Sequence, residues 1–221
     1  MPDDLLEFAY DRTRAVAYAH TWAYFRNPEF YNFNEIGGDC TNFASQCIFA
    51  GSGVMNYTPT YGWYYIDLND RAPAWTGVIY LFNFLTTNQG VGPFGREVPM
   101  EEVRPGDIVQ LQINQATFHH TPVIVAIEGS GPPSLDSIIV AAHSSDCDCR
   151  PLSSYSIQAV RFIHIEGVRS RQLVTLPPIP VPLPHPTISS QPATPARPTM
   201  PGAPTILEER PFPMPLPTQE A

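Results

Sequence analysis

Apolar side chains recur with helical spacing in three stretches of the first half of the chain. The first stretch begins after Asp3 or Asp4, either of which can cap a helix, and ends before Asn27-Pro28. The second stretch covers residues 40–50, and the third covers residues 74–86. Apolar positions three and four residues apart line one face of a helix. The pattern therefore predicts three helices.

The second half of the chain carries short apolar runs instead. The runs lie at residues 107–111, 123–127, 138–143 and 159–165, and the turn Arg104-Pro105-Gly106 precedes the first of them. Short apolar runs bounded by turn residues are typical of strands. Helices followed by strands that short loops connect predict an α+β fold with an antiparallel sheet.

Proline dominates the C-terminal end. Of the 26 prolines, 15 lie between Pro177 and Pro217. Because proline cannot donate a backbone hydrogen bond, we expect residues 174–221 to form a disordered, extended tail. Residues 1–173 then form a single domain. The tail could recruit a protein partner through an aromatic groove, or it could be a plain linker.

The charge of the chain excludes two classes of partner. The formal net charge is −9, and lysine and arginine form no cluster. Nucleic acids and anionic membrane surfaces both require basic patches, so we expect neither as a partner. The sequence contains no apolar run long enough to span a membrane and does not begin with a signal peptide. As written, it looks cytoplasmic, and an extracytoplasmic location stays open.

A cysteine follows a glycine turn at the start of the second predicted helix, in the run Gly37-Gly38-Asp39-Cys40. We expect the side chain of Asp39 to cap this helix by accepting from its first-turn N–H groups. A thiol at a helix N-terminus lies near the positive end of the helix dipole, which lowers its pKa and favours the nucleophilic thiolate. Cys47 lies within the apolar face, where cysteine commonly behaves as a small hydrophobe.

Histidines stand at the ends of two predicted strands. His119 and His120 precede the second strand, and His143 ends the third. A cysteine hydrolase needs a base that takes the thiol proton and a third group that orients this base. Because neighbours in a strand point to opposite faces, only one of His119 and His120 can meet Cys40.

Two motifs give the chain a family resemblance. The block Gly38-Asp39-Cys40-Thr41-Asn42-Phe43-Ala44-Ser45-Gln46 and the later block Arg104-Pro105-Gly106-Asp107-Ile108-Val109-Gln110 resemble the putative amidase domain related to the NlpC/P60 and CHAP groups. The resemblance covers roughly residues 8–165. It implies a papain-like fold, in which N-terminal helices pack on a small antiparallel sheet.

The resemblance also implies roles for individual residues. Cys40 would be the nucleophile, His120 the general base and His143 the group that orients it. Asp146 is the alternative third residue and His119 the alternative base. Backbone N–H groups, including that of Cys40, would stabilise the oxyanion. The family implies no cofactor.

These features predict a cysteine-dependent hydrolase that cleaves an amide bond through a thioacyl-enzyme. The substrate would be a peptide, including a peptidoglycan stem peptide, or a small amide. The absence of wall-binding repeats leaves a cell-wall substrate open. A catalytically inactive peptide-binding module whose tail recruits a partner is the alternative, and an acyltransferase is a third possibility.

Two further groups of residues have side chains that can form sites. The run Cys147-Asp148-Cys149, near His143 and Asp146, has potential metal ligands, but a Cys-x-Cys pair without a second pair fits structural zinc poorly. We therefore expect a loop there and no metal. An aromatic group either lines the substrate cleft or packs on the helices; its members are Tyr57, Tyr61, Trp63, Tyr64 and Tyr65.

Overall fold

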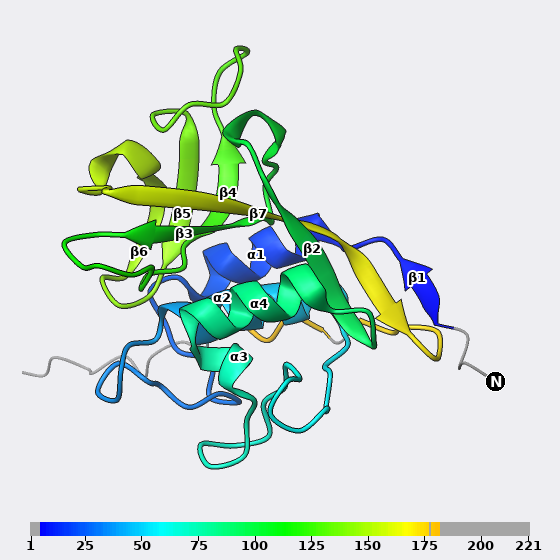
Figure 1. The fold of residues 1–221 in the computed structure, drawn as a ribbon. Helices are drawn as coiled ribbons and strands as arrows, with labels where there is room; N and C mark the ends of the chain where they lie inside the picture. Colours follow the sequence, from blue (N-terminus) through cyan, green and yellow to red (C-terminus); the bar gives the residue numbers. More distant parts are fainter. Residues whose placement is uncertain (1–4, 177, 182–221) are drawn as a thin grey trace, which may run out of the picture. The chain divides into compact units, whose positions relative to one another are not determined.

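A computed structural model describes residues 5–176 and 178–181 (Figure 1). Its helices are α1 (Arg12–Trp22), α2 (Cys40–Ser52), α3 (Pro73–Thr76) and α4 (Val78–Thr87), with short 3-10 turns η1 (Met100–Glu102) and η2 (Leu152–Ser154). Its strands are β1 (Leu6–Phe8), β2 (Gly92–Val98), β3 (Ile108–Gln112), β4 (Val123–Ile127), β5 (Ile138–Ala142), β6 (Cys147–Pro151) and β7 (Ala159–Ser170).

The strands form one antiparallel sheet, with helices gathered against one of its faces (Figure 1). Within the described residues the strand order is β1-β7-β3-β4-β5-β6, and β2 also pairs with β7. Ile108 of β3 pairs with Ile163 of β7, and Val123 of β4 pairs with Ala141 of β5. The mixture of helices and antiparallel sheet confirms the predicted α+β class.

Apolar side chains cover both faces of the sheet. In β5, Ile139 and Ala141 belong to the core shared with the helices, whereas Ile138 and Val140 belong to a second cluster on the other face. This two-sided burial explains why the strand reads as a continuous apolar run in the sequence. Helix α2 is the most deeply buried of the helices. All of its residues are buried except Phe49, which is half-buried.

The helices differ from the predicted ranges at their ends. Helix α1 starts only at Arg12, because the side chain of Asp11 caps it by accepting from the N–H of Arg14 at 3.0 Å. Asp3 and Asp4, the predicted caps, lie outside the described residues. The third predicted helix is divided into α3 and α4 at Gly77, whose φ of −111° and ψ of 123° are extended.

All four predicted strands are present, and the described sheet has three more. Strands β1 and β2 pair with β7, and β6 pairs with β5. The loop expected at Cys147-Asp148-Cys149 was therefore wrong, since these residues form β6. Cys147 is the one buried residue of β6, and half-buried and exposed positions alternate after it, so its apolar positions are too few to stand out in the sequence.

The aromatic group of residues 57–65 divides between core and surface. Trp63 is fully buried, and its indole N–H donates to Ser45 Oγ of α2 at 3.0 Å. Tyr65 is also buried, whereas Tyr57 and Tyr61 are exposed. The buried members pack on the helices, which is one of the two alternatives expected from the sequence, the other being that they line a substrate cleft.

The packed part of the chain extends beyond residue 173. Ile179 packs against the helical core, and a Cβ on Gly53 would lie 2.8 Å from Leu176 and 2.9 Å from Val174. Gly53, with a φ of +64°, ends α2 and leaves room for this close approach. The interaction expected of the proline-rich tail falls largely on residues 182–221, outside the described residues.

None of the helices within residues 5–176 is long and apolar enough to cross a membrane.

Candidate active site

Cys40 is the first residue of α2, and a glycine turn delivers it there. Gly37 and Gly38 have φ values of +106° and +99°, a backbone conformation that glycine adopts readily. The Cys40 residue is 6% exposed, so its thiol lies mostly inside the protein. The sequence therefore predicted the start of this helix correctly, and α2 ends at Ser52, two residues beyond the predicted end at Ala50.

Asp39 does not cap the helix with its side chain, which corrects the expectation from the sequence. Its Oδ1 instead accepts from the N–H of Phe33 and from the side-chain amide of Asn42, both at 2.8 Å. The Asp39 carboxylate is fully buried. Because this carboxylate binds Phe33 and Asn42, it does not cap the first-turn N–H groups of α2. An oxyanion site requires N–H groups that are free in this way.

A pocket of about 480 Å³ opens beside Cys40. Cys40, His119 and His120 all border it, so the structure brings the candidate nucleophile and both candidate bases to one cavity. Its size lies within the range of typical small-molecule sites. The exposed tyrosines of the aromatic group, Tyr57 and Tyr61, do not line it.

His120 is buried, and one of its ring nitrogens has no partner. Its Nε2 atom is inaccessible to solvent and makes no hydrogen bond within the described residues. The ring lies 5.5 Å from that of Tyr155, centroid to centroid. Burial lowers the pKa of His120 from 6.5 to about 4, with smaller contributions from His119 and Arg150. The imidazole is therefore neutral at pH 7 and able to accept a proton.

The Cys40 thiol is protonated in this environment. Its sulfur lies 3.8 Å from the backbone oxygen of His119 and 3.8 Å from Thr41 Oγ1. Burial raises the pKa of Cys40, and hydrogen bonds from Thr121 and Thr41 offset this only in part. The lowered pKa expected from the helix terminus is therefore wrong, because the loss of solvent outweighs the local dipoles. Among the described contacts, the sulfur has no hydrogen bond with the ring of His120.

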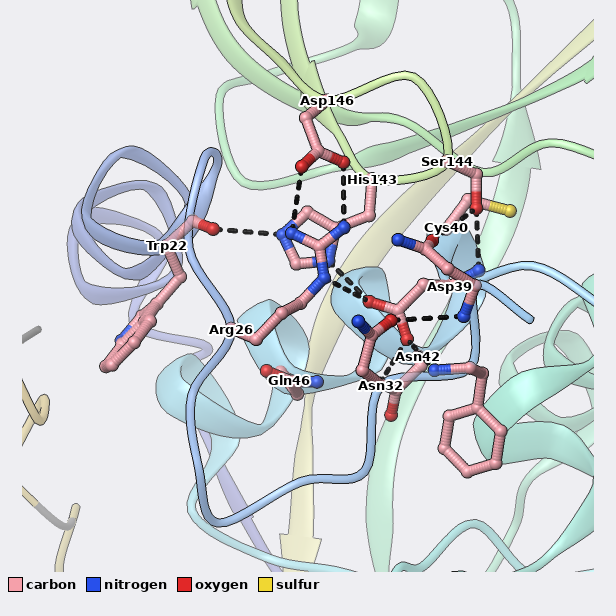
Figure 2. Close-up of polar contacts among 12 residues, drawn as sticks. Trp22, Arg26, Asn32, Asp39, Cys40, Asn42, Gln46, His143, Ser144 and Asp146 are labelled. Carbon is pink, nitrogen blue, oxygen red and sulfur yellow. Dashed lines mark hydrogen bonds and ion pairs between the residues drawn. The ribbon is translucent and has the colours of Figure 1, made fainter. Parts of the chain in front are cut away.

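His143 lies in a buried polar cluster behind the nucleophile. Its Nδ1 is 2.6 Å from Asp39 Oδ2, and its Nε2 is 2.9 Å from the backbone oxygen of Trp22. Both partners are acceptors, which fits a ring that carries a proton on each nitrogen. Figure 2 shows this cluster, with the sulfur of Cys40 directed away from it. The structure therefore brings His143 to Asp39, and does not bring it to His120.

Asp146 and His119 are also engaged elsewhere. The carboxylate of Asp146 accepts two hydrogen bonds from Arg26, at 2.8 and 2.9 Å (Figure 2). The ring of His119 is half-buried, and its Nδ1 lies 3.1 Å from the backbone oxygen of Thr117. Of the two alternatives, only His119 borders the pocket.

A buried pair of threonines connects the segments that carry Cys40 and His120. Thr41 Oγ1 lies 3.1 Å from Thr121 Oγ1, and both residues are almost completely buried. Thr41 follows Cys40 in α2, and Thr121 follows His120. One hydrogen bond thus ties together the residues adjacent to both proposed catalytic groups.

Other residues of the pocket were not predicted. Arg150 and Tyr155 border it, together with four serines: Ser144, Ser145, Ser154 and Ser156. Ser144 and Ser145 have positive φ values of 61° and 111° in the turn between β5 and β6, and Ser144 Oγ accepts from the N–H of Asp39 at 2.6 Å. The sequence pattern carries no signal for these residues, because the β5–β6 hairpin that brings them to Cys40 was not predicted.

One group of described residues could hold a metal ion, and it includes two members of the Cys147-Asp148-Cys149 run. The ligand atoms of His20, Asp148 and Cys149 lie within 4.8 Å of one another. The thiol of Cys147, by contrast, lies 3.5 Å from the hydroxyl of Tyr155. The two thiols of β6 therefore have different partners, since Cys149 Sγ lies 3.6 Å from Asp148 Oδ1.

Comparisons with known proteins agree with the putative amidase domain that the two sequence motifs resemble. The chain is similar to the Uncharacterized protein YhbB of Bacillus subtilis (strain 168), with 30% identity over 132 residues. The match spans 59% of this chain and 42% of that relative. No solved structure matches the chain significantly. The model of the family described as "Putative amidase domain" matches residues 9–165, which include Cys40, His120 and His143. The chain therefore belongs to the putative amidase domain family.

Proposed function

We propose that this protein is a cysteine-dependent amide hydrolase, with Cys40 as the nucleophile and His120 as the general base. The observation that carries the proposal is the shared pocket, which a helix-borne cysteine and a neutral, buried histidine both border. Family membership supports hydrolysis of an amide bond. The order of a cysteine at a helix start and a histidine before a strand supports a relation to the papain-like NlpC/P60 and CHAP enzymes.

In the first step, the Cys40 thiol transfers its proton to the imidazole of His120 while its sulfur attacks the amide carbonyl carbon. The transfer occurs with substrate bound, since burial favours the neutral form of both groups in the free protein. The negative charge that develops on the carbonyl oxygen is stabilised by backbone N–H groups, including that of Cys40 at the start of α2. No separate thiolate needs to accumulate.

The tetrahedral intermediate then collapses. The C–N bond breaks, the amine leaves with the proton from His120, and a thioester on Cys40 remains. Water attacks this thioester after giving a proton to His120, and the C–S bond breaks. The sulfur regains its proton, so the products are a carboxylic acid, an amine and the original thiol.

We assign His143 a positioning role. It hydrogen-bonds to Asp39, the residue immediately before the nucleophile, and stacks on Phe43 of α2 with ring centroids 4.0 Å apart. These contacts hold the first turn of α2 against the end of β5. His119 stays the alternative base, because it borders the same pocket.

The second candidate is a peptide-binding module that has lost catalysis. The raised pKa of Cys40 and the lack of a described hydrogen bond from its sulfur to the ring of His120 favour it. An acyltransferase would use the same thioester with an amine in place of water. Adding an amine acceptor and analysing the products separates transfer from hydrolysis.

Alkylation by iodoacetamide tests the proposal, read for each cysteine by peptide mass spectrometry between about pH 5 and 9. We expect the Cys40 rate to fall in His120→Ala and to be retained in His119→Ala, while the fully buried Cys47 stays unreactive in every variant. A screen of peptide and small-molecule amides follows, with Cys40→Ala as the inactive control. A Cys40 rate that does not depend on His120 would favour the binding module, and loss of the rate in His119→Ala alone would reassign the base.

A further inference from the structure

The pocket beside Cys40 differs in charge from the rest of the protein. The chain has a formal net charge of −9, yet none of the described residues that line the pocket is aspartate or glutamate. Its charged side chain is Arg150, on strand β6, and two histidines and four serines supply other polar groups. The pocket therefore favours negatively charged ligands, although the protein as a whole is acidic.

The guanidinium of Arg150 is held in place by uncharged groups. Its Cζ lies 3.7 Å from the centre of the Tyr155 ring. Its Nε donates to Ser154 Oγ at 2.7 Å, and a terminal nitrogen donates to the backbone oxygen of Ser154 at 3.1 Å. A guanidinium has five N–H donors, so these contacts leave donors for a further partner.

Among the described residues, Arg150 has no carboxylate partner, unlike Arg12, Arg26, Arg96 and Arg169. Arg12 pairs with Asp107, and Arg26 pairs with Asp39 and Asp146. No described aspartate or glutamate lies within ion-pair distance of Arg150. A half-buried, stacked guanidinium without an acid is prepared to bind one at little further cost in side-chain entropy.

We propose that Arg150 forms a carboxylate subsite, so that the protein acts on amides that carry a free acid group near the scissile bond. This inference rests on the proposed function and adds its substrate class. Arginine binds carboxylates through paired N–H donors, and the surrounding serine hydroxyls can complete the hydrogen bonding of the second oxygen. The charge of Arg150 also acts on His120, which supports its closeness to the reacting groups.

The test compares two reagents of nearly equal size, anionic iodoacetate and neutral iodoacetamide. Their alkylation rates at Cys40 are measured by peptide mass spectrometry, with glutathione in the same tube as the reference thiol. We expect the iodoacetate to iodoacetamide ratio at Cys40 to exceed that of glutathione. We expect it to fall about threefold to tenfold in Arg150→Gln, the size expected for one partly screened charge at short range. Arg150→Lys should retain part of the preference, and high salt should weaken it in the wild type.

Arg96→Gln is the matched control, because Arg96 is exposed, pairs with Glu102 and Glu166, and does not line the pocket. It should leave the ratio unchanged. An equal ratio in wild type and Arg150→Gln, or an equal fall in Arg96→Gln, would overturn the subsite. If Arg150→Gln does not fold, the test is whether high salt lowers the iodoacetate to iodoacetamide ratio at Cys40 in the wild type. Failure of the proposed function has a different signature, namely a Cys40 iodoacetamide rate that does not depend on His120.

Discussion

The Nδ1 atom of His143 lies 2.6 Å from Oδ2 of Asp39, and both side chains are almost completely buried. The contact joins the residue that follows β5 to the residue that precedes the nucleophile. Arg26 lies 3.3 Å from the same carboxylate oxygen and binds Asp146 at the surface. The first turn of α2 is thus anchored by charged groups that do not themselves line the pocket.

His143→Ala should therefore destabilise the fold. Its loss leaves the buried Asp39 carboxylate with one hydrogen-bond partner fewer, and the oxygen of Trp22 keeps only the N–H of Phe25 as a described donor. Removal of one partner of a buried pair typically costs about 3 to 5 kcal/mol. Urea unfolding of the wild type and the variant measures the difference.

His119→Ala is the control for this substitution, because His119 is half-buried and its ring has a single described hydrogen bond, to Thr117. We expect a change of less than about 1 kcal/mol in this control. A stable His143→Ala that has lost Cys40 reactivity would contradict a role in holding α2 and would favour the role predicted from the sequence, in which His143 orients His120.

The sequence predicted the elements that repeat a local pattern. Helix α2 begins at Cys40 as its glycine turn indicated, and β4 has the predicted bounds of Val123–Ile127. Strands β1 and β2 were missed because they join the sheet by pairing with the distant strand β7, whereas β6, the hairpin partner of β5, was missed because it has few apolar positions. Such pairing is a tertiary property that hydrophobic spacing does not encode.

At the candidate site, the structure places Cys40 and His120 beside one pocket, leaves His143 outside its lining, and gives the thiol a different electrostatic environment from the expected one. Cys40 and His120 border one pocket, as their motif positions suggested. The pKa of Cys40 is raised instead of lowered, because the sequence does not reveal how deeply α2 is buried. Arg150 was missed because its position depends on the β5–β6 hairpin.

The hydrogen bond between Thr41 and Thr121 should couple the two halves of the site. Thr41→Val or Thr121→Val alone leaves one buried hydroxyl without its partner, which typically costs about 1 to 3 kcal/mol. The double variant leaves neither hydroxyl, so its cost should be smaller than the sum of the single costs. A double-mutant cycle by urea unfolding should give a coupling of about 1 kcal/mol. Strictly additive costs would show that the hydroxyls do not interact.

The thiol of Cys40 should remain protonated at neutral pH in the free protein. Burial raises its pKa above the ordinary value, so the thiolate absorbance near 240 nm should appear only in the alkaline range. The signal is the difference between wild type and Cys40→Ser during a pH titration. Cys47→Ser serves as the control for a buried thiol outside the pocket. A Cys40-dependent thiolate signal at pH 7 would instead indicate a preformed thiolate–imidazolium pair.

His120 should make the stability of the fold depend on pH. Its pKa is about 4 in the folded protein and near 6.5 in an unfolded chain, so the unfolded state binds more protons between these values. Stability should therefore be complete above about pH 6.5 and fall as the pH decreases towards 4. A shift of this size corresponds to about 3 kcal/mol. His120→Asn should lack this contribution, so the difference in unfolding free energy between wild type and variant should shrink by that amount from pH 7 to pH 4. A difference that is constant with pH would mean that the ring is accessible and titrates normally, which would also remove the physical basis for a neutral, buried base at this position.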